Sequence, residues 1–407
     1  MRIAFVTFEY PPNINGGAGV YADNLVKSLA KLGNEVTVYV PSIGTESSVE
    51  ELNGVVVKRV RQRFKGVPGW INYCLNLAKG LERLHAKDGI DIVHLNGLGF
   101  FAFRDRVNGP PYISTAHHLS GETARKGELR IIDRLLDMQG ENGFIVPFME
   151  RQGIRMVDRY LAVSEQSKEG LKCLYGRPEN RIDVVWHGVD GSRAPIGPQD
   201  RETIRTRMQL PEGQLLLFVG RVDDPRKNLL GLIRAMASLP RELDAKLLVV
   251  GSGSNAKAKS LAREMNLDER IFFMGRVSPE DLWSTYLVAD GLVCVSWQEG
   301  FGLTIIEALC AGCPVISTEV GVAPDLQGRL EKVVPVNDEE ALAEAISVLF
   351  KRKGRPKVAE VVIPYELSWE RCAMETVAGY EKAIDQKHQA NSAKFGEGSA
   401  ISFNENN

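Results

Sequence analysis

The sequence predicts an α/β protein with two doubly wound parallel sheets, one in each half of the chain. Short apolar runs alternate with segments of helical period throughout, which is typical of strands joined by helices in a parallel sheet. One polar segment rich in Pro and Gly, residues 191–199, interrupts this alternation. At 407 residues the chain is long enough for two or three domains, each with its own core.

The first predicted domain comprises residues 1–190. It begins with a buried strand at 3–8 and a helix at 20–32, in which Val20, Leu25 and Leu29 fall near one face. Further strands are expected at 35–40, 54–61, 91–95, 112–115, 160–164 and 182–186, and helices at 75–86 and within 121–156.

The second predicted domain comprises residues 211–366, after a linker at 191–210. Its strands are expected at 215–219, 245–250, 271–274, 291–296 and 314–317. A helix at 368–387 follows, and the polar residues 388–407 are predicted to be a disordered tail. Ligands of open α/β folds bind at the carboxyl ends of the strands, so we expect the two sheets to face a ligand-binding cleft.

The composition excludes several classes of protein. A net charge of -2 gives no global field that would attract nucleic acid. The six cysteines lie mostly inside apolar runs, as in a reduced, cytoplasmic protein. No apolar run approaches the roughly 18 residues of a membrane-spanning helix.

One stretch has the pattern of a phosphate-binding β-α-β unit. The strand 291–296 is followed by a glycine-containing turn and then by a helix from about Gly302. The first amides of such a helix have no intrahelical partner and can bind an anion. Glu299 and Glu307 lie on either side of these amides. Donors between two acceptors suit a ligand with a phosphate centre and hydroxyls at both ends, such as a nucleotide-sugar.

These residues also carry a resemblance. Glu299 and Glu307, with Gly-Phe-Gly after the first and Ala-Leu-x-Ala-Gly-x-Pro-Val-Ile around the second, resemble the E-x7-E signature of glycosyltransferase family 4. That family consists of retaining enzymes of the GT-B fold, which has two Rossmann-like domains, and glycogen and sucrose synthases have similar motifs. The resemblance implies that Glu299 binds sugar hydroxyls, that Glu307 binds the ribose, and that the final helix returns to the first domain. The resemblance also implies that Phe301, Gly302 and Leu303 of the same motif contact the donor.

Two further segments match the donor site of this family. Gly220 and Arg221 follow a strand, and Lys227 lies six residues after Arg221. A guanidinium and an ammonium there suit the two phosphates of a leaving diphosphate. No Asp-x-Asp motif for a divalent ion occurs in the sequence, so we expect no metal in the reaction. Arg276 follows another strand, where the backbone of similar enzymes faces the nucleotide base.

The loop at Gly16 and Gly17 has two interpretations. The string from Gly17 to Ala22 fits G-x-G-x-x-A, which suggests a nicotinamide site. The glycines, however, come eight residues after the strand, and no acidic residue ends the second strand. They instead resemble the glycosyltransferase loop whose backbone approaches the donor diphosphate.

Four histidines are candidates for a role in the site or the core. His117 resembles the family histidine that bonds the transferred sugar near the reacting carbon, and His118 is the alternative. His94 is expected to order the core or rim of the first domain, and the role of His187 stays open.

A basic segment, residues 58–70, contains Lys58, Arg59, Arg61, Arg63 and Lys65. This segment has three possible roles. It could make peripheral contact with an anionic membrane that carries a lipid acceptor, it could bind an anionic acceptor, or it could be a solvated strand and loop.

The predicted activity is metal-independent, retaining hexosyl transfer from a nucleoside-diphosphate sugar, with UDP favoured over ADP or GDP. The acceptor is an unidentified hydroxyl of a saccharide, lipid or small molecule, and no further cofactor is expected. The alternatives are a nucleotide-sugar epimerase on the same fold and a non-catalytic nucleotide-sugar-binding protein.

Overall fold

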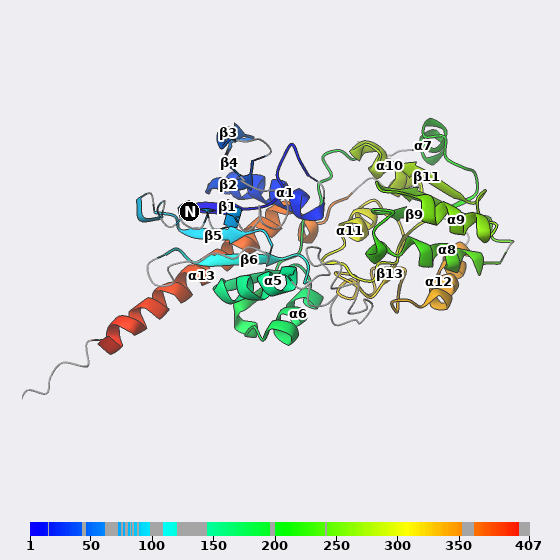
Figure 1. Cartoon of the computed structure of the whole chain (residues 1–407). Coiled ribbons are helices and arrows are strands. Elements are labelled where there is room, and N and C mark those ends of the chain that lie inside the picture. Colours follow the sequence, from blue (N-terminus) through cyan, green and yellow to red (C-terminus); the bar gives the residue numbers. More distant parts are fainter. Residues whose placement is uncertain are drawn as a thin grey trace, which may run out of the picture. The chain divides into compact units, whose positions relative to one another are not determined.

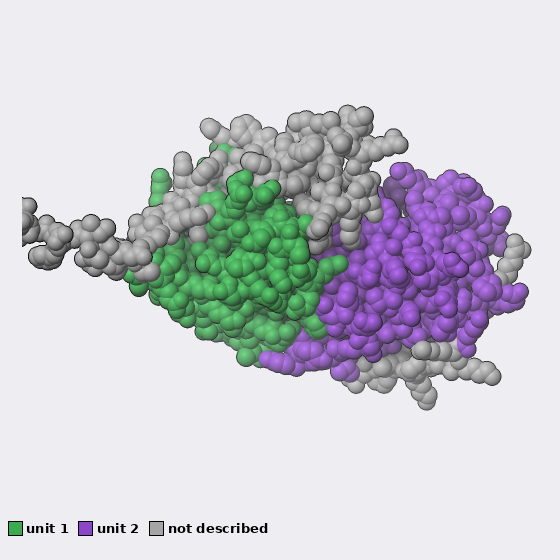
Figure 2. Space-filling view, turned by 90° about the horizontal axis from the view of Figure 1, so that it is seen from below, with its two compact units in different colours: residues 1–188, 369–407 green, residues 189–368 purple. Residues whose placement is uncertain are grey.

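The chain forms two compact units. Unit 1 comprises Met1–Gly188 together with Trp369–Asn407, and unit 2 comprises Val189–Ser368 (Figure 2). The computed structural model describes residues 1–14, 16–42, 46–61, 72–97 except 75, 78–79, 82, 84 and 88, 109–119, 145–195, 200–240, 242–351 and 362–398.

Unit 1 is built on an eight-stranded sheet with the order β3-β4-β2-β1-β5-β6-β7-β8. Its strands are β1 (Arg2–Val6), β2 (Glu35–Pro41), β3 (Ser48–Leu52), β4 (Val55–Val60), β5 (Ile92–Leu95), β6 (Tyr112–Ala116), β7 (Arg159–Ala162) and β8 (Ile182–Val184). All neighbours are parallel except β3 and β4, which form a hairpin. The central strands are apolar and buried, as expected for strands covered on both faces.

Helices cover both faces of this sheet. On one face lie α1 (Gly17–Lys31) and the long C-terminal helix α13 (Trp369–Gly398), which contact each other (Figure 1). Their apolar side chains share a core cluster with β1, β2 and β4. A second cluster joins the opposite face to α5 (Ile145–Met156), α6 (Glu165–Tyr175) and the helical residues described between 72 and 87.

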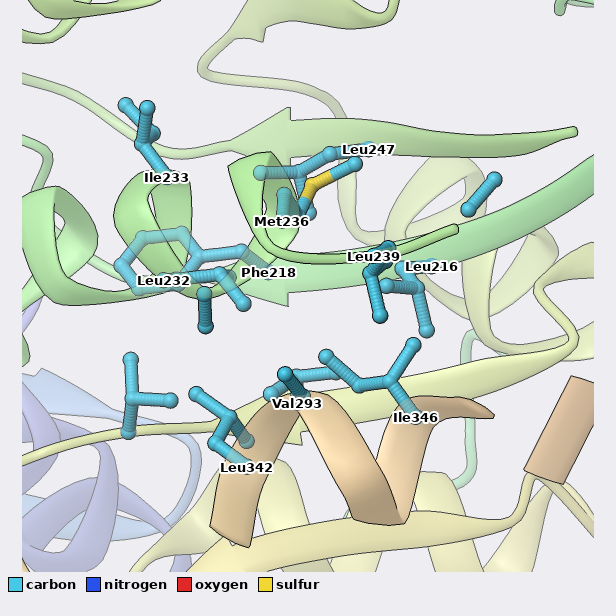
Figure 3. Close-up of a cluster of buried hydrophobic side chains, with 14 of the residues drawn as sticks. Leu216, Phe218, Leu232, Ile233, Met236, Leu239, Leu247, Val293, Leu342 and Ile346 are labelled. Carbon is cyan, nitrogen blue, oxygen red and sulfur yellow. The ribbon is translucent and has the colours of Figure 1, made fainter. Parts of the chain in front are cut away.

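Unit 2 contains a six-stranded parallel sheet with the order β11-β10-β9-β12-β13-β14. Its strands are β9 (Gln214–Val219), β10 (Ala245–Val250), β11 (Ile271–Gly275), β12 (Gly291–Cys294), β13 (Val315–Thr318) and β14 (Lys332–Val334). Figure 3 shows the core on one face, where Phe218, Leu247 and Val293 of the sheet meet Met236 and Ile346 of two helices. The unit's α-helices are α7 (Arg201–Arg207), α8 (Leu229–Ala237), α9 (Ala256–Glu264), α10 (Pro279–Val288), α11 (Leu303–Cys310) and α12 (Glu339–Lys351).

Two strands were not predicted, and both lie at sheet edges. β3 is largely exposed and carries two glutamates, so it lacks the apolar run that identified the other strands. The turn that joins it to β4 has Asn53 and Gly54 at φ 54° and 75°. Asn-Gly is a strong hairpin signal, so the sequence did contain the evidence for β3. β14 spans only three residues, too few for a recognisable pattern.

The predicted linker and tail differ from the structure. Residues 191–210 belong to unit 2 and include α7, because Asp200 caps this helix through the Thr203 amide at 2.9 Å. The final helix continues through 388–398, where a disordered tail was predicted, since no Gly or Pro interrupts the sequence between Gly379 and Gly396. Residues 196–199 and 399–407 lie outside the described residues.

Two cations of the basic segment, Lys58 and Arg59, make contacts within unit 1. Arg59 is 9% exposed, pairs with Glu50, and donates to Pro11 O at 2.6 Å. Lys58 lies over the Tyr39 ring at 5.5 Å. The prediction that Arg59 is a membrane-facing cation is therefore wrong, because its guanidinium group binds Glu50 and Pro11 O inside unit 1. Residues 62–70 lie outside the described residues. Within the part of the chain that is described, no helix is long and apolar enough to cross a membrane.

Candidate active site

The acidic loop after β12 and the basic turn after β9 meet within unit 2. Lys227 Nζ lies 2.6 Å from Glu299 Oε1, and Ser296 Oγ donates to the same oxygen at 2.6 Å. Burial is the largest single effect on Lys227 and lowers its pKa, but the charge and hydrogen bond of Glu299, together with Cys294 and Asp224, raise the pKa above its ordinary value overall. The lysine is therefore a fixed positive charge beside the loop that carries Glu299.

Backbone contacts hold this loop on both sides. Trp297 N donates to Arg226 O at 2.8 Å, and Thr318 Oγ1 donates to Ser296 O at 2.6 Å. Val322 N donates to Phe301 O at 2.8 Å. These bonds tie the loop to the turn after β9 and to the segment after β13, so the Glu299 position is fixed by its neighbours.

The helix α11 begins as the phosphate-binding pattern predicts. Gly302 precedes it with φ 99°, a left-handed conformation that favours glycine. Ile305 N donates to Gly302 O at 3.0 Å. The amides of Leu303 and Thr304 are in the first turn, where no intrahelical acceptor is available. An anion at this end would meet both amides and the positive end of the helix dipole.

Glu307 lies farther along α11 and is held by a tyrosine. Tyr286 OH, on α10, donates to Glu307 Oε2 at 2.8 Å. Burial raises the pKa of Glu307 to about 7, against the opposing effect of this hydrogen bond. The charge of Asp190 acts in the same direction as burial. The carboxyl group is therefore poised to accept hydrogen bonds from ligand hydroxyls once it is ionised.

The turn after β9 presents an exposed cation next to a closely packed backbone. Arg221 is 60% exposed and pairs with Asp224 at 3.2 Å. A Cβ added at Gly251, where φ is 147°, would lie 1.8 Å from Gly220 O. The glycine-containing loop after β10 thus packs directly on Gly220 and leaves no room for a side chain.

Arg276 is placed differently from the other predicted donor residues. It is exposed after β11, next to Gly275 with φ 70°. Among the described residues, no contact joins Arg276 to Lys227, Glu299 or Glu307. The role predicted for Arg276 is contact of its backbone, rather than its side chain, with the nucleotide base.

In unit 1, the Gly16–Gly17 loop is occupied by a carboxylate of the same unit. Gly16 caps α1, and its amide donates to Glu9 Oε2 at 3.0 Å. A Cβ on Gly19 would lie 2.8 Å from that oxygen. Glu9 therefore satisfies one of the donors at the N-terminal end of α1.

His117 lies in a cluster of aromatic and polar side chains at the carboxyl ends of β1, β5 and β6. Its Nε2 lies 2.6 Å from Asn96 Oδ1. Its ring meets Tyr21 edge-on with centroids 4.7 Å apart, and His187 at 5.3 Å. Burial lowers the pKa of His117 to about 3, so the imidazole is neutral at physiological pH.

The other histidines have different surroundings. His94 is fully buried between Tyr380 OH at 2.6 Å and Thr115 Oγ1 at 2.7 Å, which makes it a core residue of unit 1. His187 is 4% exposed, and its ring packs with Trp369 and Tyr21. His118 is partly exposed after His117.

Several residues of the site were not predicted from the sequence. Ser296, Tyr286 and Gly321 support the acidic loop and α11, while Glu9 and Asn96 support the unit 1 cluster. Asn96 directly follows a buried strand, which is a usual place for functional side chains. Nothing in the local sequence marks Tyr286, since it is one of several consecutive buried residues in the second half of α10. No group of three or more metal-ligating side chains occurs in the described ranges.

Comparison with known proteins places both halves in one family. The model for group 1 glycosyl transferases matches residues 200–363, and the model for glycosyltransferase family 4 matches residues 15–193. An uncharacterized glycosyltransferase of Methanocaldococcus jannaschii is 28% identical over 404 residues, covering 95% of this chain and 99% of that protein. D-inositol 3-phosphate glycosyltransferase of Mycobacterium sp. strain KMS is 32% identical over 329 residues, covering 76% of this chain and 71% of that protein.

Solved structures agree on the fold. Sucrose-phosphate synthase from Thermosynechococcus elongatus aligns with a TM-score of 0.68 at 21% identity, covering 97% of this chain and 99% of that one. Anabaena HepE in complex with UDP and glucose aligns with a TM-score of 0.63 at 16% identity, covering 98% and 100%. These likenesses establish the GT-B fold. With the family models and the 32% identical relative, they show that the chain belongs to the group 1, family 4 glycosyltransferases.

Proposed function

We propose that this glycosyltransferase is a retaining, metal-independent enzyme that moves a hexose from a UDP-sugar to a hydroxyl acceptor. The observation that carries the proposal is the Lys227–Glu299 pair, at 2.6 Å, in which Glu299 lies on the loop that leads into the first turn of α11. A positive charge, amide donors and a carboxylate within one segment match a sugar joined to a diphosphate. Glu307, farther along α11, supplies an acceptor for the ribose.

The chemistry follows from where charge develops. The acceptor hydroxyl attacks the anomeric carbon, the bond from that carbon to the diphosphate oxygen breaks, and the nucleoside diphosphate leaves. The departing phosphate oxygen takes the proton of the acceptor on the same face, so the new bond keeps the original configuration. Lys227, Arg221 and the first amides of α11 stabilise the negative charge of the leaving diphosphate.

The Lys227–Glu299 pair indicates how the donor diphosphate would bind. Glu299 neutralises Lys227 within unit 2. A diphosphate carries more negative charge than one carboxylate, so it competes for the ammonium group. Glu299 would then be released to accept hydrogen bonds from the sugar. Lys227, Arg221 and the first amides of α11 provide the positive charge that a divalent ion provides in other transferases. This supports metal-independent transfer.

The choice of UDP is supported by the structural neighbour HepE, which was solved with UDP and with UDP-glucose. The acceptor is a hydroxyl compound of unassigned identity. Because relatives are named D-inositol 3-phosphate glycosyltransferases, inositol 3-phosphate is a suitable first acceptor probe, alongside saccharides and lipids.

The decisive experiment measures release of nucleoside diphosphate from UDP-, ADP- and GDP-sugars, with and without EDTA, in the presence of the acceptor probes. We expect release from UDP-sugars that EDTA does not reduce, and a product whose anomeric proton coupling by NMR matches the donor. An inverted product or loss of turnover in EDTA would contradict the respective part of the proposal. Formation of an epimer without any acceptor would indicate an epimerase, and binding without turnover a non-catalytic protein.

A further inference from the structure

Asn96 has a hydrogen-bonding arrangement that fixes the orientation of its amide group. Its side chain is 5% exposed. The amide nitrogen donates to Ala18 O at 3.0 Å and to Thr7 Oγ1 at 3.0 Å. A backbone carbonyl only accepts hydrogen bonds, so the atom that faces Ala18 must be the nitrogen. The opposite orientation of the amide would place two acceptors against each other.

This orientation decides which nitrogen of His117 carries the proton. With its nitrogen committed to Ala18 and Thr7, Asn96 presents Oδ1 to His117 Nε2 at 2.6 Å. An amide oxygen accepts, so Nε2 must donate and is protonated. In a neutral imidazole the second nitrogen, Nδ1, then carries a lone pair and no hydrogen. The structure gives Nδ1 no hydrogen-bond partner among the described residues.

We propose that Asn96 is a positioning residue which holds His117 in the tautomer protonated at Nε2, so that His117 meets its ligand through Nδ1 as a hydrogen-bond acceptor. The chemical class that this atom selects is a hydroxyl group that donates its hydrogen. Identifying that group as a hydroxyl of the transferred sugar rests on the proposed function. The tautomer itself rests only on the contacts within unit 1.

The surroundings keep His117 neutral. The titratable groups that face it are His94, His187 and Tyr21. Burial holds the pKa of all three histidines below the ordinary value, and it raises that of Tyr21. None of these neighbours supplies a negative charge that would favour an imidazolium at neutral pH.

The tautomer can be observed directly in the full-length chain. Long-range proton–nitrogen NMR correlations of a ¹⁵N-histidine sample distinguish a protonated ring nitrogen from one with a free lone pair. His117→Gln identifies the resonances of His117 among the six histidines. We expect Nε2 protonated and Nδ1 unprotonated from pH 5 to pH 8. A protonated Nδ1, or an imidazolium within that range, would overturn the proposal.

Asn96→Asp provides the matching perturbation, with Asn24→Asp as control. Asn24, on α1, donates to Val20 O at 2.9 Å and contacts no histidine among the described residues. A carboxylate beside Nε2 favours the charged imidazole, so the pKa of His117 should be higher in N96D than in N24D, and the protonated ring becomes a donor at Nδ1. The second Asp oxygen faces Ala18 O, where Asn96 donates, so we also expect a lower melting temperature for N96D. In N24D the resonances of His117 should remain those of the unmodified protein, and equal titration in both variants would contradict the role of Asn96.

Turnover gives a second readout. The ratio of N96D to N24D turnover of UDP-glucose should rise about tenfold over one to two pH units as His117 loses its proton. A constant ratio, with the NMR titration present, would refute hydrogen-bond acceptance at Nδ1. If no donor is turned over by the unmodified protein while the Nε2 tautomer is observed, the proposed function fails and the assignment of Asn96 stands. If N96D does not fold, the tautomer of the unmodified protein decides the question.

Discussion

Lys227 places a single positive charge where the leaving diphosphate is expected. Its ammonium is 2.6 Å from Glu299 and lies beside the loop that leads into α11. Removing one such stabilising group usually lowers kcat about 10²–10³-fold. We therefore expect Lys227→Ala to reduce nucleoside diphosphate release from UDP-glucose by this amount.

The matched control is Lys259→Ala. This lysine is exposed on α9, over the Phe273 ring at 5.5 Å, and it has no contact with the Lys227–Glu299 pair. It should keep full turnover and an unchanged melting temperature. A Lys227→Ala enzyme that is as active as Lys259→Ala would remove Lys227 from the site.

Glu307 makes donor binding depend on pH. Its pKa in the folded protein is raised to about 7 by burial, and an ionised carboxylate accepts ribose hydroxyls better than a protonated one. UDP affinity should therefore increase from pH 6 to pH 8. Titration calorimetry of Glu307→Gln gives the control, because the glutamine does not ionise while the protonation of UDP itself is unchanged. Equal pH dependence in both proteins would exclude Glu307 as the ionising group.

The same group affects stability with a defined sign. The unfolded chain releases this proton near pH 4.5 and the folded chain near pH 7. Between these values the unfolded state binds fewer protons, so Glu307 lowers the free energy of unfolding as pH rises. Urea unfolding of Glu307→Gln should show a smaller decrease in stability from pH 5 to pH 7 than the unmodified chain. A steeper decrease in the variant would show that another group dominates.

At the residue scale, the sequence indicates candidate charged residues of the site, but not the residues that hold them in place. Glu299, Lys227 and Glu307 stand in a pattern whose spacing relative to strands indicates their use. Tyr286 and Asn96 act only through contacts made by the fold, with separations of 21 residues in both cases. A contact that depends on which strands become neighbours leaves no local signature.

The elements that position the acidic loop depend on a glycine after β13. Gly321 has φ 57°, and an added Cβ would lie 2.4 Å from Phe301 O and 3.1 Å from Glu299 Cβ. Gly321→Ala would therefore displace the loop as well as strain the backbone. We expect a loss of about 1–3 kcal/mol in stability together with a fall in donor turnover.

Gly328→Ala separates these two effects. Gly328 has φ 94°, but nothing lies within 4 Å of its added Cβ. It should lose stability through the backbone conformation alone, about 1 kcal/mol, and keep its turnover per folded molecule. If both variants lose turnover equally, the contact of Gly321 with the acidic loop is not what positions Glu299.

Element prediction succeeded where burial leaves a continuous apolar run. The six central strands β1, β5, β6, β9, β10 and β12 are nearly all buried, and each was predicted within about two residues. It failed at β3, whose exposed edge carries charges, and at β14, which is too short. Edge strands lack the buried face that produces a pattern.

The whole molecule depends on the return of the C-terminal helix to the N-terminal sheet. Trp369, Cys372 and Tyr380 of α13 are buried in the same cluster as Leu25 and Ile113. Tyr380 OH bonds His94 across 286 residues of sequence. Local pattern could predict a helix here but not its partner, and only the family resemblance indicated the return.

This arrangement predicts how truncation divides the chain. Ending it at Ser368 would remove every α13 side chain from the core of unit 1, where a buried large side chain contributes about 1.5–3 kcal/mol. The core of unit 2 draws on residues 216–350 only. We therefore expect a 1–368 chain to lose unit 1 and keep unit 2.

Limited proteolysis followed by mass spectrometry tests this division. The 1–368 chain should yield a protected fragment close to 189–368 and rapid digestion of residues 1–188, which belong to unit 1. The control chain 1–398 retains all of α13 and should protect both units. Because the last buried side chain described on α13 is Lys387, removal of 399–407 leaves these contacts in place. Protection of 1–188 in the shorter chain would mean that the sheet of unit 1 is stable without its returning helix.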